Sequence, residues 1–337
     1  MCARSISAMW KSVCCEVRGR SHKRDDIPCQ DKTLARMRYG INVIALADGA
    51  GSANMSHYGA ECVTECISEY LINNFTDIIN NEDGTLVKIN ILDAIVERLE
   101  ATAKDHECEV RDLSSTLLAV AICDNRYLMI HIGDGVIGYL EDNELKVASH
   151  PDNGEHSNIT TFVTSNNALT SMRIIRGNIT GIVGFVLMSD GTCDSLYHKQ
   201  TETLAKVIIK LLDRTSLLDT AAFTKKLTDT FRSVIAKNTH DDCSIALLAR
   251  PISNPREYHD LTFDEKCELL GYNPNNHDTR GIVSRVEDLL TFLEVPKDEQ
   301  SVVEFLMTKP NHVKKKLKRL QEAGLIVKNN DLYSRAI

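Results

Sequence analysis

The chain has 337 residues, of which 43% are hydrophobic, so it is long enough to bury a sizeable core and to form one large domain with a smaller one. Its formal net charge of −8 argues against a protein that as a whole binds nucleic acid or an anionic membrane. Eleven cysteines are scattered without the paired short spacings of a zinc ribbon, which predicts reduced thiols. No segment reaches the roughly 18 uninterrupted apolar residues of a spanning helix, so we expect a soluble, cytoplasmic protein without a membrane partner.

Short β-branched runs bounded by Gly, Asp and Asn predict strands in the first 250 residues. These runs are 41–47, 116–123, 127–132, 136–140, 174–179, 183–188 and 244–249. Apolar residues at every third or fourth position predict helices at 58–74, 86–104, 201–212 and 220–237. Because the strands cluster between paired helices, the predicted fold class is α+β, with sheets covered by helices rather than a regular βαβ winding.

The periodicity stops at a segment rich in turn residues, where Pro251 and Pro255 flank Ser253 and Asn254. This segment predicts a boundary between a domain at 1–252 and a second, mostly helical domain at 257–337. The end of the chain is predicted to form helices at 301–307 and 312–323. A short β-hairpin follows, with Asn329 and Asn330 at its turn.

Aspartates recur at the ends of the predicted strands. "ALADGAGS" contains Asp48, "IGDG" contains Asp134, "MSDG" contains Asp190, and "HDDCSIALL" opens with Asp241 and Asp242 before its strand. A single Asp-Gly is usually a solvated turn, but strand ends in one layered core can bring several carboxylates into one cleft. Oxygen ligands alone select Mg²⁺ or Mn²⁺. Because two such ions can hold a water and clamp a phosphoryl group, the pattern predicts hydrolysis of a phosphate ester.

Six motifs occur in order along residues 10 to 250: "CQD" at 29–31, "ALADGAGS", "SSTL" at 114–117, "IGDG", "MSDGTCD" and "HDDCSIALL". Together they resemble the metal-dependent type-2C (PPM) serine/threonine protein phosphatases. The glycine pattern DGAGS is similar to that of a bacterial subgroup of this family.

The resemblance implies a fold, a metal centre and a reaction. The implied fold is a four-layer αββα sandwich, in which two antiparallel sheets are flanked by helices. A water activated by two ions would attack phosphoserine or phosphothreonine, without a cysteine nucleophile, and would oppose a partner kinase. The implied metal ligands are Asp31, Asp48, the Gly49 carbonyl, Asp190 and Asp241, with Asp134 and Asp194 for a third, weaker ion.

The chain departs from the family around the phosphate-binding loop. Many members carry an arginine five residues before the aspartate that matches Asp31, and here that position is Asp26. The basic loop offers His22 as a general acid and Arg24 as a phosphate ligand instead, although a surface histidine explains His22 equally well. Two further departures are Gln30 in place of glutamate and Asp242 in place of asparagine. We expect both residues to support the metal site without binding an ion themselves.

The last forty residues resemble a winged-helix module, with Val313, Leu317 and Leu320 facing inward. The helix also carries a basic cluster, Lys314, Lys315, Lys316, Lys318 and Arg319, which could face DNA phosphates. Lysine and arginine are also the commonest solvated helix residues, so we expect a protein-docking role and keep DNA contact as the alternative. Two other readings of the whole chain remain open, namely a phosphatase-fold signalling adaptor with little turnover and a DNA-binding regulator.

Overall fold

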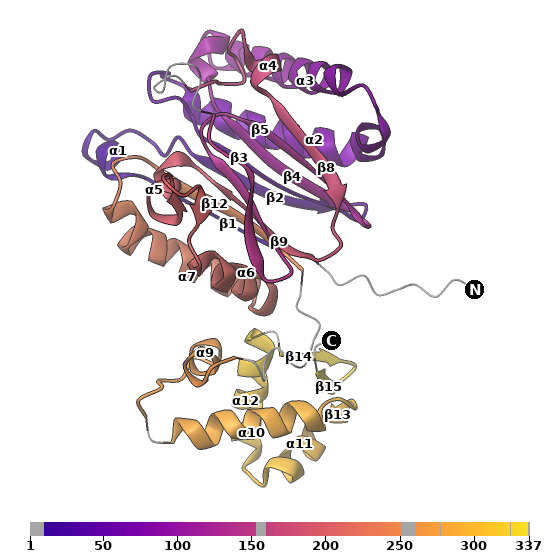
Figure 1. Cartoon of the computed structure of the whole chain (residues 1–337). Helices are drawn as coiled ribbons and strands as arrows, with labels where there is room; N and C mark the ends of the chain where they lie inside the picture. The colour runs from indigo at the N-terminus through magenta and orange to yellow at the C-terminus, as the bar shows by residue number, and fades with distance from the viewer. Residues whose placement is uncertain (1–9, 153–159, 251–260, 277, 324, 336–337) are drawn as a thin grey trace. The chain divides into compact units, whose positions relative to one another are not determined.

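The computed structural model describes residues 10–152, 160–250, 261–276, 278–323 and 325–335 (Figure 1). The chain divides into two compact units. The larger comprises Trp10–Leu212 and Thr224–Ala249, and the smaller gathers the chain beyond Arg250 together with Asp213–Phe223. The predicted boundary at 253–256 lies outside the described residues. Among the described helices, none is long and apolar enough to cross a membrane.

Two five-stranded antiparallel sheets form the centre of the larger unit. The first sheet has the order β1-β12-β9-β6-β7, with β1 Lys11–Val17, β12 Cys243–Ala249, β9 Ile182–Met188, β6 Val136–Glu141 and β7 Glu144–Ser149. The second has the order β2-β3-β4-β5-β8, with β2 Lys32–Arg38, β3 Ile41–Ala47, β4 Leu117–Cys123, β5 Arg126–Ile132 and β8 Arg173–Asn178. The predicted α+β class with antiparallel sheets is therefore confirmed.

The residues of β3 show how the layers pack, because successive side chains of a strand point to opposite faces. Ile44 and Leu46 join Phe185 of β9 in the core between the two sheets. Val43 belongs to the other core, under α2 Ser56–Asn80 and α3 Gly84–Asp105, which cover the outer face of the second sheet (Figure 1).

The opposite outer face carries the parts of two helices that belong to this unit, residues 207–212 of α6 Val207–Leu217 and residues 224–233 of α7 Thr220–Ser233 (Figure 1). Leu212 of α6 lies against Gly184 of β9, where a Cβ would come within 2.9 Å of the leucine side chain. The layers of the larger unit are thus helices, sheet, sheet and helices.

All seven predicted strands are present, with their ends within one residue of the prediction. Sequence analysis missed β1, β2 and β7, and each is an edge strand of its sheet. Edge strands are less buried than central ones, and β2 has no buried residue, so they lack the continuous apolar run that marked the others. The predicted helix at 201–212 was wrong at its start, since Thr203–Leu204 forms the short strand β11, paired with β10 Tyr197–His198.

The smaller unit contains a helical core closed by a three-stranded sheet. Its elements are α9 Phe263–Leu269, α10 Thr279–Phe292, β13 Lys297–Asp298, α11 Glu299–Leu306, α12 Pro310–Glu322, β14 Ile326–Asn329 and β15 Leu332–Arg335, with the strand order β13-β15-β14. Val313, Leu317 and Leu320 are buried as predicted. The hairpin turns at Asn330 and Asp331, whose φ angles are positive, one residue later than predicted.

Candidate metal centre

The predicted carboxylates converge at one edge of the two sheets. Asp48 follows β3, Asp134 follows β5, and Asp190 begins α5 (Asp190–Leu196) directly after β9. Asp31 precedes β2 and Asp241 precedes β12. The charges of the other four all raise the pKa of Asp48, so the five aspartates form a single group, which we call the carboxylate cluster.

Burial and like charge act together on the carboxylates of the cluster. Burial, followed by the charges of the other cluster members, holds the pKa of Asp48 well above its ordinary range. Burial and the charges of Asp241 and Asp134 raise the pKa of Asp190 to about 7, although a hydrogen bond with Asp48 opposes the shift. Burial also raises the pKa of Asp241. Packed carboxylates of this kind must gain either protons or cations to stay together.

Asp31 shows the need for a cation most directly. It is 1% exposed, and neither of its carboxylate oxygens has a hydrogen-bond partner. Ser189 and Ser244 lie close enough to lower its pKa, but burial and the charge of Asp242 raise that pKa well above its ordinary range. A buried carboxylate without a donor is costly, and a divalent cation would remove that cost.

The cluster fits Mg²⁺ or Mn²⁺ in charge and in donor type, because all of its side-chain donors are carboxylate oxygens. The carboxylates are not drawn into a closed coordination sphere. Within the part of the chain that the structure describes, no three His, Cys, Asp or Glu side chains are grouped so as to hold a metal ion as they stand.

Backbone contacts fix Asp48 and Gly49 at the edge of the second sheet. The amide of Asp48 donates to Thr116 Oγ1 over 2.9 Å, and its carbonyl accepts from the Thr116 amide over 2.8 Å. The Gly49 amide donates to the Gln30 carbonyl over 3.2 Å. A Cβ on Gly49 would lie 2.8–2.9 Å from atoms of Ser56, so only glycine fits this position.

The two aspartates predicted for a third ion differ in their surroundings. Asp134 belongs to the cluster and accepts a hydrogen bond of 2.6 Å from Thr160 Oγ1. Asp194 lies one helical turn after Asp190 on α5, but it pairs with Lys199 over 3.3 Å and accepts from Thr239 Oγ1 over 3.2 Å. Its charge is not among the main ones that shift the pKa of Asp48 or Asp190, so Asp194 lies at the margin of the cluster.

The Asp242 carboxylate connects the two ends of the basic loop, which comprises residues 19–30. One of its carboxylate oxygens accepts from the Gly19 amide and the other from the Gln30 amide, each over 2.6 Å. The first oxygen also lies 2.9 Å from His22 Nδ1. Asp242 is 1% exposed, so one buried carboxylate holds both ends of the loop, and its charge lies next to the histidine.

The two candidate catalytic residues of the loop, which includes α1 Arg20–Arg24, are therefore placed differently. His22 is held next to Asp242, and its charge acts on Asp241 of the cluster. Arg24 forms an ion pair with its neighbour Asp25 over 2.7 Å, and its side chain is 73% exposed. The structure gives Arg24 a surface ion pair rather than a place among the carboxylates.

Sequence analysis missed three threonines that position the aspartates. Thr116 holds the Asp48 backbone, Thr160 donates to Asp134, and Thr239 donates to Asp194. Only Thr116 had a sequence signal, since it belongs to the SSTL motif.

The chain is similar to known protein phosphatases. A family model described as protein phosphatase 2C matches residues 18–232. Serine/threonine-protein phosphatase 3 of Escherichia coli (strain K12) is 28% identical over 170 residues, a match that covers 48% of this chain and 66% of that protein, a little under two thirds of its length.

Solved structures show the same fold at low identity. The serine/threonine phosphatase Stp1 from Staphylococcus aureus has a TM-score of 0.52 at 14% identity, covering 74% of this chain and 99% of that one. A bacterial serine phosphatase has a TM-score of 0.52 at 15% identity, covering 72% and 98%. Similarity at this level extends to the mixed α+β fold with antiparallel sheets.

Proposed function

The chain belongs to the protein phosphatase 2C family of metal-dependent serine/threonine phosphatases, and from this premise we propose that it hydrolyses phosphoserine and phosphothreonine in proteins at the carboxylate cluster. The observation that carries the proposal is the convergence of five aspartates at one sheet edge, where burial and the charges of neighbouring carboxylates raise the pKa values of Asp48 and Asp190. The DGAGS pattern supports assignment to a bacterial subgroup of the family. We also propose that the protein acts in the cytoplasm.

We propose that Asp31, Asp48, Asp190 and Asp241, with the Gly49 carbonyl, hold two Mg²⁺ or Mn²⁺ ions, and that Asp134 and Asp194 serve a third. When bound, such ions neutralise the phosphoryl oxygens and activate a water for attack. Other residues of the chain hold the metal ligands in position. Thr116 and the Gly49 backbone fix one side of the cluster, and the side-chain oxygen of Gln30 is buried without a hydrogen-bond partner.

The loop supplies the proton. His22 is the candidate proton donor to the leaving serine or threonine oxygen, because an imidazole can act as a general acid. Its Nδ1 lies 2.9 Å from a carboxylate oxygen of Asp242 without forming a hydrogen bond with it. Arg24 remains a candidate phosphate ligand only if it leaves its ion pair with Asp25.

The test of the function is hydrolysis of a phosphothreonine peptide by purified protein with Mn²⁺, with Mg²⁺ and with a chelator. Turnover should require metal and should be lost in Asp48→Asn and Asp190→Asn, while both variants stay folded by circular dichroism. Asp219→Asn is a matched control, because Asp219 caps α7 outside the site. A folded wild-type protein that binds metal without turnover would favour the alternative, a phosphatase-fold adaptor.

We propose a winged-helix arrangement for the smaller unit. Its support is the order of elements, in which α10, β13, α11 and α12 precede a hairpin whose strand β15 lies between β13 and β14.

The contacts of the basic cluster on α12 favour a docking role over DNA binding. Lys314 lies 3.6 Å from Glu299, burial lowers the pKa of Lys316, and the Arg319 guanidinium stacks 4.4 Å from the Tyr272 ring centroid. Three of the five cations are thus engaged by the unit itself. On this basis we propose that the unit docks a protein, for example the phosphoprotein substrate or its kinase.

Fluorescence anisotropy with duplex DNA tests this choice. DNA binding whose affinity falls steeply with salt and is lost in Lys315→Glu would support a DNA-binding regulator and contradict the docking proposal.

A further inference from the structure

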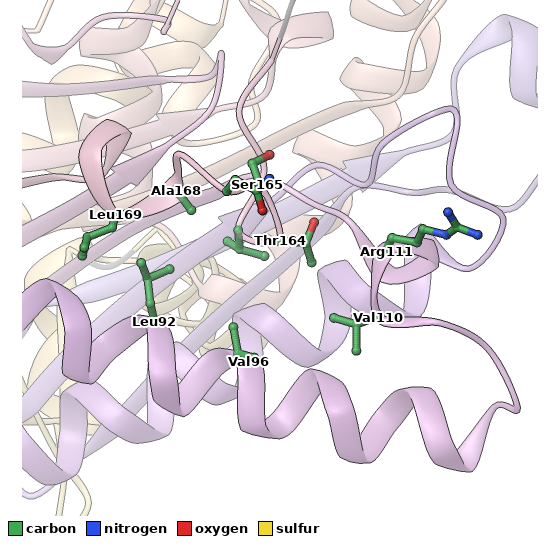
Figure 2. A pocket seen from close by; sticks show the side chains of 10 residues that line it. Leu92, Val96, Val110, Arg111, Thr164, Ser165, Ala168 and Leu169 are labelled. Atoms are coloured by element: carbon green, nitrogen blue, oxygen red, sulfur yellow. The ribbon is translucent and has the colours of Figure 1, made fainter.

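A pocket of about 320 Å³ opens on the surface of the larger unit (Figure 2). One wall is α3, the second is the short helix η1 Val110–Leu113, and the third is the segment that runs into α4 Ala168–Ser171. The pocket is lined by Leu92, Val96, Val110, Arg111, Val163, Thr164, Ser165, Asn166, Ala168 and Leu169.

The lining is mostly aliphatic. Leu92 and Val96 point from α3 towards Ala168 and Leu169 (Figure 2), and Leu92, Val96 and Leu169 are only partly buried. Arg111 is the one charged residue of the lining, and it pairs with Glu109 over 2.8 Å with its side chain 78% exposed. Because most of the lining is aliphatic and its one charge is paired with Glu109, the pocket suits an uncharged aliphatic side chain.

The third wall is connected to the cluster by hydrogen bonds. Thr164 Oγ1 lies 2.7 Å from Ser114 Oγ, and the Ser114 carbonyl accepts from the amide of Ala50, next to Gly49, over 2.9 Å. The Val163 amide donates to the Ser115 carbonyl over 2.9 Å. Ser115 in turn pairs with Gly49.

The same segment limits the distance from the pocket to the cluster. Thr160 donates to Asp134, and Thr164 already lines the pocket. Four residues of extended chain span at most about 14 Å. A substrate chain whose phosphorylated residue lies at the cluster can therefore reach the pocket within about four residues.

We infer that this pocket binds an aliphatic side chain of the phosphoprotein substrate, within about four residues of the phosphorylated serine or threonine. The inference rests on the proposed function and adds to it a preference for an aliphatic residue in the substrate sequence near the phosphorylated residue. A peptide is the occupant that the surroundings favour, because the aliphatic pocket lies within reach of the phosphate site and Ser165 and Asn166 at its rim can hydrogen-bond a peptide backbone. Burial of a leucine-sized side chain is expected to strengthen binding roughly ten- to hundred-fold.

The experiment is a leucine scan of an eleven-residue phosphothreonine peptide with a Gly/Ser background, one leucine at a time from position −5 to +5. For wild-type protein with Mn²⁺, leucine at one or two positions within four residues should raise kcat/KM roughly ten- to hundred-fold, mainly through KM. The gain should disappear in Val96→Asp and in Leu92→Asp, and hydrolysis of p-nitrophenyl phosphate should stay unchanged in both. Ile89→Asp is the matched control, because Ile89 is 37% exposed on α3, one turn from Leu92, and does not line the pocket.

A flat leucine scan, or a gain that survives both pocket variants when these are folded, overturns the inference. The same peptides labelled with fluorescein are titrated by fluorescence anisotropy, which reports binding without turnover. Leucine-dependent binding that Val96→Asp abolishes, with no hydrolysis of any substrate, would retain the pocket and refute the proposed phosphatase activity. Hydrolysis without any leucine dependence would support the proposed phosphatase activity and overturn the inference about the pocket. A pocket that serves a second copy of the chain would instead show Val96-dependent dimerisation without peptide dependence, which also overturns the inference.

Discussion

The substitution Asp242→Asn tests whether one buried carboxylate holds the basic loop in place. Both of its oxygens accept backbone amides over 2.6 Å, from Gly19 and Gln30. An asparagine keeps one acceptor and turns an NH₂ group towards the other N–H donor. Hydrogen bonds to charged groups contribute about 1.5–3 kcal/mol and an orphaned buried donor costs about 1–3 kcal/mol, so we expect a loss of about 2–4 kcal/mol in the free energy of unfolding.

The same substitution should also reduce catalysis, because it removes the negative charge that lies 2.9 Å from His22 Nδ1. A displacement of about 1 Å in a catalytic group can cost roughly 100-fold in rate, so we expect kcat to fall by roughly 10- to 100-fold with a smaller change in KM. Wild-type and variant proteins are compared by urea denaturation and by steady-state hydrolysis of a phosphothreonine peptide.

The matched control for this prediction is Asp26→Asn in the same loop. The Asp26 side chain is 95% exposed and pairs with Arg18 over 3.4 Å, so its replacement should change stability by less than about 0.5 kcal/mol. An Asp242→Asn protein with wild-type stability and wild-type kcat would refute the reasoning, since asparagine would then support the loop as well as the carboxylate does.

Three further predictions concern pH and backbone space. Because the pKa of Asp190 is about 7 in the folded protein against an ordinary 3.8, the folded state binds the extra proton between these values, so metal-free protein should lose stability as pH rises from 4 to 7. Urea denaturation in chelator should show this slope, and Asp190→Asn should reduce it. Burial lowers the pKa of His131 to about 3 from an ordinary 6.5. The unfolded state therefore takes up a proton that the folded state does not, and the stability contributed by neutral His131 is lost as pH falls from 6.5 to 3. His131→Gln should be less stable at pH 7, and its free energy of unfolding should fall less steeply in acid. Gly49→Ala should abolish most activity and lower the free energy of unfolding by about 1–3 kcal/mol, because its Cβ would contact Ser56. Gly51→Ala is the control, since it has open space at the Cβ position and should behave as wild type in the same assays.

The central strands were predictable because burial leaves a continuous apolar run in the sequence. β3 and β12 are almost entirely buried, and both were predicted to within one residue. The edge strand β2 carries a mixture of half-buried and exposed residues, and its conformation is imposed by pairing with β3. Its local sequence therefore has no periodicity that separates it from a loop.

The start of α6 illustrates the opposite error. The segment 201–212 has apolar residues at helical spacing, but Thr203 and Leu204 pair with Tyr197 and His198 in a two-residue ladder. Such a pairing depends on a turn that returns the chain onto itself. Tertiary context thus overrode the local helical pattern.

The sequence by itself predicted the aspartates that lie together at the sheet edge, because an aspartate next to a buried strand can be recognised without knowing where the strand lies. Only the tertiary structure decided how these aspartates are supported. Asp242 binds Gly19 from 223 positions away, Thr160 reaches Asp134, and Asp194 is drawn to Lys199 and Thr239. Hydrogen bonds of this kind depend on how distant segments pack against each other, and such packing is encoded by the whole chain rather than by any one segment of it.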